Sequence, residues 1–102
     1  MAEHPAQTDQ DLDSIRNARA LARRAQAAQS HLAELNQEQI DRVVEAMAAA
    51  ATAQAVPFAR MAVDETGMGL EADKARKNRF ASETIYRFIQ PMRTVGIIRR
   101  ID

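Results

Sequence analysis

Few residues in this sequence could take part in acid–base, metal or nucleophilic chemistry, and they are widely separated. The two histidines, His4 and His31, have no second histidine or cysteine at metal-ligand spacing, so both are predicted to be surface residues. Asp64 and Glu65 are adjacent, and neighbouring side chains on a helix point in different directions, which argues against an acid–base pair. A serine nucleophile needs an attached base, and the sequence identifies none for Ser14, Ser30 or Ser82.

Cysteine is absent from all 102 residues. Its absence excludes disulfides, thiolate metal ligands and a cysteine nucleophile within this chain. We therefore expect no catalytic, cofactor-binding or metal-binding residue in it.

The two glycines of Gly67-Met68-Gly69 could form either a turn or a phosphate-binding loop. A phosphate loop needs free backbone N–H groups at a helix start, but Glu71 and Asp73 occupy that position and no Gly-Lys-Ser/Thr sequence follows. The turn is favoured. Gly67 is predicted to close a helix in the left-handed conformation, Met68 to point inward, and Gly69 to redirect the chain.

Charge is balanced overall but divided along the sequence. Residues 1–73 carry six basic and twelve acidic side chains, whereas residues 74–102 carry eight and two. A basic segment leaves nucleic acid or a phosphate-bearing ligand open. Few aromatics accompany it (Phe80, Tyr86 and Phe88), so a solvated helix face is the favoured reading and no nucleic-acid partner is expected.

The N-terminal residues lack the basic start and apolar run of a signal peptide. The longest alanine-rich stretch, AMAAAATAQA, is far shorter than the roughly 20 apolar residues of a membrane span. We therefore expect a cytoplasmic location and no membrane partner.

Periodicity predicts a mostly α chain of about four helices and a C-terminal strand. The first helix begins near Thr8 or Asp9, after a disordered tail over 1–8, and frays over 30–35. Asn36 and Gln39 resemble a capping box that opens the second, whose apolar residues recur at helical spacing: Ile40, Val43, Val44, Met47, Ala48 and Ala51.

Pro57 suits the first position of a third helix that buries Phe58, Met61 and Ala62. A fourth helix over 71–89 ends at Gln90-Pro91. The helical segment thus covers 9–93, and 94–102 reads as the first strand of an incomplete hairpin. With 46% apolar residues, many of them alanine, and only 4% aromatic residues, the chain is expected to stabilise itself weakly.

Residues 10–102 resemble the N-terminal part of the CoA-acylating aldehyde dehydrogenases, which include the aldehyde-dehydrogenase half of bifunctional aldehyde–alcohol dehydrogenases. The resemblance is carried by Asn36-Gln37-Glu38-Gln39-Ile40-Asp41, by Met61-Ala62-Val63 with Glu65-Thr66-Gly67-Met68-Gly69, and by Asp73-Lys74 with Lys77-Asn78 and Phe80-Ala81-Ser82-Glu83.

The resemblance implies an α/β enzyme that interconverts a small aldehyde and its acyl-CoA with NAD or NADP. In that family a cysteine attacks the aldehyde, hydride passes to the nicotinamide, and CoA resolves the thioester. The helices at this end pack around the cofactor-binding domain, and the hairpin belongs to the oligomerisation element. This sequence holds neither the cysteine nor a dinucleotide-binding motif, so no family site residue maps onto it.

Two hypotheses follow from these observations. In the first, the chain is an N-terminal piece of such an enzyme, inactive alone, whose partners are the rest of the enzyme or a homologous subunit in a homo-oligomer. In the alternative, it is a free-standing helical module that docks on a larger homologue. Whether the basic residues over 74–79 approach CoA phosphates stays open.

Overall fold

The computed structural model describes residues 8–102, in which all regular structure is helical. The chain divides into two compact units that meet between Leu35 and Asn36, and each is described by itself. Residues 1–7 of the expected disordered tail lie outside the described residues, and Thr8 has extended backbone. Within the described range, no helix has both the length and the apolar content to cross a membrane.

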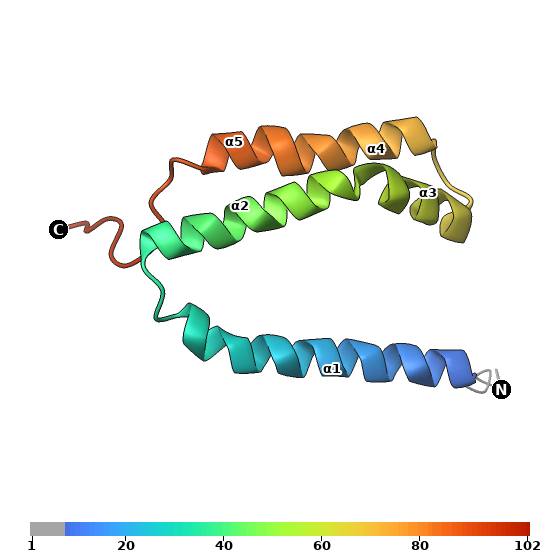
Figure 1. Ribbon diagram of the computed structural model, residues 1–102, viewed down its shortest axis with the longest axis horizontal. Helices are drawn as coiled ribbons and strands as arrows, with labels where there is room; N and C mark the ends of the chain where they lie inside the picture. The colour runs from blue at the N-terminus through green and yellow to red at the C-terminus, as the bar shows by residue number, and fades with distance from the viewer. Residues whose placement is uncertain (1–7) are drawn as a thin grey trace. The chain divides into compact units, whose positions relative to one another are not determined.

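The first unit contains helix α1, Asp9–Leu32 (Figure 1). Thr8 and Asp11 form a capping box, with Asp11 N–H donating to Thr8 Oγ1 at 3.1 Å and Thr8 N–H donating to Asp11 Oδ2 at 2.9 Å. The box satisfies two N–H groups that have no partner within the helix. The predicted start is confirmed, and the helix ends within the region expected to fray.

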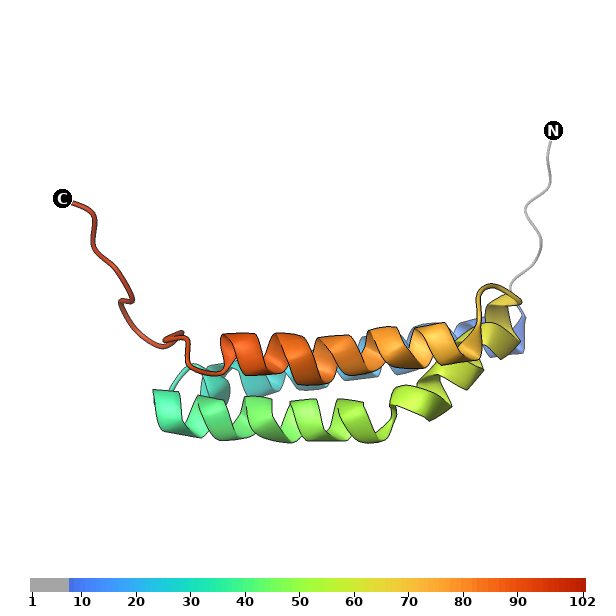
Figure 2. The same cartoon turned by 90° about the horizontal axis from the view of Figure 1, so that it is seen from above.

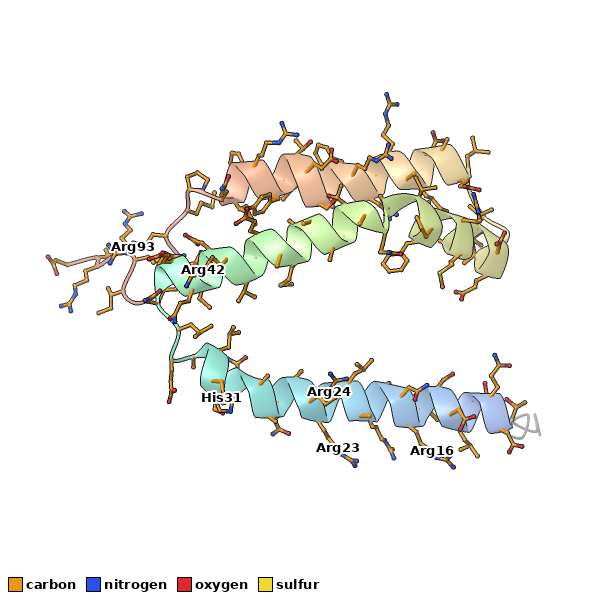
Figure 3. All side chains as sticks on the ribbon, in the orientation of Figure 1. Arg16, Arg23, Arg24, His31, Arg42 and Arg93 are labelled. Atoms are coloured by element: carbon orange, nitrogen blue, oxygen red, sulfur yellow. The ribbon has the colours of Figure 1, made fainter. Side chains whose placement is uncertain are left out.

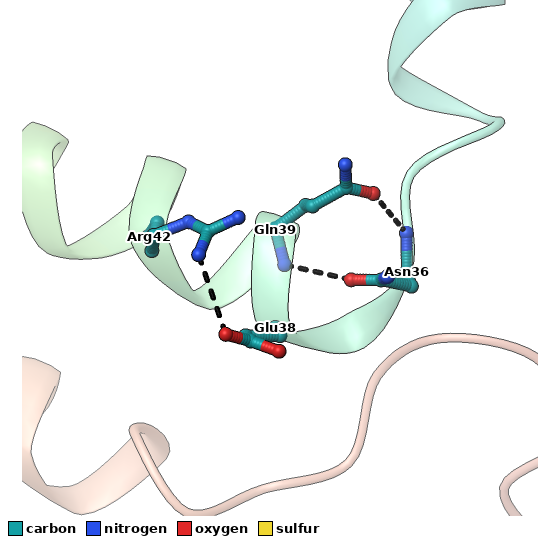
Figure 4. A network of polar contacts seen from close by, with 4 residues as sticks. All are labelled: Asn36, Glu38, Gln39 and Arg42. Carbon is teal, nitrogen blue, oxygen red and sulfur yellow. Dashed lines mark hydrogen bonds and ion pairs between the residues drawn. The ribbon is translucent and has the colours of Figure 1, made fainter.

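The second unit begins with α2, Gln37–Ala53, and its predicted capping box is confirmed. Gln39 N–H donates to Asn36 Oδ1, and Asn36 N–H donates to Gln39 Oε1, both at 2.9 Å (Figure 4). One turn further on, Arg42 Nη1 lies 3.3 Å from Glu38 Oε1 in an exposed ion pair. The capping box and this ion pair are local contacts that define the start of α2.

Helix α3, Ala55–Thr66, follows α2 after the single residue Gln54, where the ribbon changes direction (Figure 2). It starts two residues before the predicted position, so Pro57 is its third residue and not its first. Proline is tolerated there because the first four N–H groups of a helix have no partner within it. Gly67 closes the helix at φ 64°, with its N–H donating to Val63 O at 2.8 Å, as the sequence predicts.

The fourth predicted helix contains a π-helical segment that the sequence did not indicate. It comprises α4, Glu71–Arg79, then η1, the π-helical segment Phe80–Ile85, then α5, Tyr86–Ile89. The run ends before Gln90-Pro91 as predicted. Figures 1 and 2 both show it lying alongside α2.

The buried centre of the second unit is made of small side chains. Ala55 and Ala59 are each 1% exposed, and Ala75 on α4 is also buried. The prediction that Phe58 and Met61 form the buried face of α3 is wrong for this chain, because they are 55% and 53% exposed. Alanine allows α3 and α4 to approach closely, and this leaves the larger side chains on other faces of α3.

Residues 94–102 have no regular secondary structure, so the predicted strand is not confirmed. A strand needs a neighbour for its ladder of backbone hydrogen bonds, and the described residues contain no other strand to supply one. Ile97, Ile98 and Ile101 are all exposed in this segment.

Candidate functional site

The residues considered for chemistry do not come together in the described part of the chain. His31 lies at the last turn of α1, where Figure 3 shows it pointing away from the ribbon, and His4 is outside the described residues. Ser30 Oγ donates to Ala27 O at 3.3 Å on the same helix, and Asp64 and Glu65 are exposed on α3. Across 8–102, no group of three or more His, Asp or Glu side chains has a metal-binding arrangement.

Ser82, on η1, takes part in a chain of hydrogen bonds that joins α2, α3, α4 and η1. Its Oγ lies 2.8 Å from Thr52 Oγ1 on α2 and donates to Asn78 O at 3.1 Å. Asn78 Nδ2 in turn donates to Ala55 O at the start of α3, at 2.9 Å. Because the Ser82 proton is directed to a carbonyl, Thr52 is the donor to Ser82. The arrangement has the character of a structural link and not of an activated nucleophile.

The Glu-Thr-Gly segment has a structural explanation that sequence reasoning missed. Thr66 Oγ1 donates to Ala62 O and accepts the N–H of Met68 at 3.1 Å, so its hydroxyl closes the last turn of α3. This uses one of the backbone N–H groups that a phosphate loop would have to leave free. Met68, predicted to point inward, is 70% exposed. The threonine hydroxyl, two residues before Met68, was the available signal.

The basic residues of α4 are largely solvated. Arg76, Lys77 and Arg79 are exposed, as expected for a solvated helix face. Lys74 is half-buried, and its side chain lies over Gly69, where an added Cβ would be only 2.9 Å from Lys74 Cε. Gly69 adopts φ 78°. Close approach of the lysine stem and the left-handed backbone both therefore favour glycine at this position.

A second polar feature missed from sequence is centred on Gln37, the first residue of α2. Its Oε1 accepts the backbone N–H groups of Thr94 and Val95 at 2.8 and 2.9 Å. Its Nε2 donates to Asp41 Oδ1 at 2.8 Å and to Thr94 Oγ1 at 3.0 Å. The sequence could not reveal these contacts, because Gln37 and Thr94 are far apart along the chain.

An open apolar groove of about 410 Å³ lies along α2 and the α4–α5 run. Its walls are formed by Val44, Met47, Ala48, Ala51, Phe58, Asn78, Ala81, Ser82, Tyr86 and Ile89. Tyr86 and Val44 are half-buried, whereas Met47 and Phe58 are exposed. The groove is suited to take an apolar side chain of another protein segment, and it offers no charged group for a polar ligand.

Comparison with known proteins relates this arrangement to enzymes that act on aldehydes. No family model matches the chain. It is 43% identical over 83 residues to the bifunctional aldehyde-alcohol dehydrogenase of Escherichia coli (strain K12), a match that covers 81% of this chain and 9% of that protein. It is 39% identical over 79 residues to the succinate-semialdehyde dehydrogenase (acetylating) of Clostridium kluyveri, covering 78% and 17%.

Comparison with solved structures gives the same kind of relative. The structure matches the crystal structure of an acetylating aldehyde dehydrogenase from Geobacillus thermoglucosidasius with a TM-score of 0.76 and 46% identity, over 93% of this chain and 21% of that one. The homologues of this chain are therefore acetylating aldehyde dehydrogenases. The chain spans only a small part of these much larger proteins.

Proposed function

We propose that this chain is a helical segment of a larger NAD(P)-dependent enzyme that interconverts a small aldehyde and its acyl-CoA. The match to the acetylating aldehyde dehydrogenase structure carries the proposal, because 46% identity over 93% of this chain is accompanied by coverage of only 21% of that enzyme. The segment has the fold of one part of such an enzyme, and the activity is that of the whole.

The packing of the second unit supports the same proposal. Only alanines are buried in it, while large apolar side chains stay exposed on α2, α3 and α5: Val43, Met47, Phe58, Met61, Phe88 and Ile89. Each such side chain contributes about 1.5–3 kcal/mol when it is fully buried. We infer that these faces are covered by the rest of the enzyme, with residues 9–93 packing against its cofactor-binding domain.

The residues that the structure describes do not fit a dinucleotide site. The glycines of Gly67-Met68-Gly69 follow helix α3, whereas a dinucleotide fingerprint follows a strand and opens a helix. We therefore assign NAD(P) and CoA binding, and the cysteine nucleophile, to the remainder of the enzyme. Here the chain acts as a scaffold element and takes no chemical step.

Residues 94–102 are proposed to become a strand when the rest of the enzyme supplies a partner. The segment is rich in β-branched residues, and its isoleucines are exposed. Pairing would satisfy its backbone groups and cover Ile97, Ile98 and Ile101. Such a hairpin would lie in the oligomerisation element of a homo-oligomer in the cytoplasm.

The test is the gene around the codon for Asp102, together with the mass of the protein in its own cells. We expect a reading frame that continues into a second strand, a glycine-containing dinucleotide motif and a cysteine, and a product that reduces NAD or NADP only when both an aldehyde and CoA are added. A stop codon directly after Asp102, with a native mass of 11.3 kDa, would overturn the proposal and favour a free-standing docking module.

A further inference from the structure

Gln37 joins two parts of the second unit that are distant in sequence. Its side-chain oxygen accepts two consecutive backbone N–H groups, those of Thr94 and Val95, at 2.8 and 2.9 Å. Because both partners are donors, the oxygen of the amide must face them, and this fixes the orientation of the side chain. The NH₂ group then faces Asp41 Oδ1 and Thr94 Oγ1, which are both acceptors.

The capping box of α2 does not need Gln37, because Asn36 and Gln39 complete it between themselves. The contacts of Gln37 therefore serve the C-terminal segment. Within residues 91–102, Val95 alone is half-buried, and Gly96 turns the chain at φ 78° directly after it. The two residues that Gln37 binds, Thr94 and Val95, are therefore followed directly by a turn of the chain at Gly96.

We propose that Gln37 is a positioning residue that holds Thr94 and Val95 against the first turn of α2 and so sets the direction in which residues 96–102 leave the helical unit. This deepens the proposed function, since those residues are the ones assigned there to a strand. Partner recognition by that strand depends on its direction, and the amide of Gln37 limits the directions available before pairing.

The test compares two methionine substitutions in the 102-residue chain by residue-resolved amide hydrogen exchange. Gln37→Met keeps the length of the side chain and removes its hydrogen bonds, and we expect the Thr94 and Val95 amides to exchange about tenfold faster. The matched control is Gln39→Met, which weakens the same helix end through the capping box. It should leave the exchange of these two amides unchanged.

A rescue variant separates positioning from general destabilisation. The double substitution Gln37→Glu with Asp41→Asn exchanges carboxylate and amide between the two positions, so acceptors still face the Thr94 and Val95 N–H groups. We expect their slow exchange and their downfield amide proton shifts to return. Equal exchange in the wild type and Gln37→Met, or an equal effect of Gln39→Met, would overturn the inference. None of these readouts uses enzyme activity, so they are independent of whether the proposed function holds.

Discussion

Replacing Gly67 by alanine tests how the Glu-Thr-Gly segment ends α3. Gly67 adopts φ 64°, and a Cβ added there would meet nothing within 4 Å, so the cost of Gly67→Ala comes from the backbone alone. An alanine in the left-handed region costs about 1 kcal/mol relative to glycine. That corresponds to an about fivefold rise in the open population of the last turn.

Native-state hydrogen exchange at residue 67 is the direct assay, because its N–H donates to Val63 O at 2.8 Å. We expect about fivefold faster exchange in Gly67→Ala and a smaller change in Gly67→Asn, since asparagine tolerates the left-handed region better. Gly96→Ala is the control, because Gly96 also has a left-handed backbone, at φ 78°, but lies outside any helix. This substitution should leave exchange at residue 67 unchanged. Unchanged or slower exchange in Gly67→Ala would refute the left-handed closure of α3.

Three further outcomes are expected. Asn36→Ala should destabilise the start of α2 by about 1 kcal/mol through loss of the cap, measured as faster exchange of the Gln39 amide; an unchanged rate would contradict the capping role. Hydrogen bonds from the backbone and side chain of Thr8 lower the pKa of Asp11 in the folded chain from 3.8. The Asp11 carboxylate therefore stabilises α1 fully above pH 3.8, and this stabilisation is lost as the pH falls through the lowered pKa of the folded chain. Helicity measured by circular dichroism should fall in that window less in Asp11→Asn than in the wild type, and equal acid losses would contradict this. The 102-residue chain should give no aldehyde-dependent reduction of NAD with or without CoA, and turnover that co-purifies with it would disprove its inactivity.

The helix boundaries that local chemistry sets were predictable from sequence. Thr8, Asn36 and Gly67 act within a few residues of themselves, and the structure places each where its capping chemistry requires. The π-helical segment was not predictable, because the apolar spacing over 80–85 fits an ordinary helix as well.

Contacts between residues that are distant in the sequence were also not predictable from it. Helical periodicity indicated an apolar face on α3 with Phe58, Met61 and Ala62, whereas close packing of α3 against α4 buries the small side chain of Ala59. Likewise, the sequence predicted the capping box of Asn36 and Gln39 but not the hydrogen bonds that Gln37 accepts from the backbone of Thr94 and Val95. A contact between the start of α2 and residues 94–95 requires the folded chain.

We propose that this chain is an incompletely covered segment of a larger acylating aldehyde dehydrogenase. The most direct test is the fluorescence of a hydrophobic dye with the isolated 102-residue chain, before and after adding a homologous acetylating aldehyde dehydrogenase that lacks the matching segment. We expect dye binding by a helical chain whose large apolar side chains on α2, α3 and α5 are exposed, and loss of that fluorescence on addition of the partner. A chain that binds no dye, or dye fluorescence that the partner leaves unchanged, would contradict it.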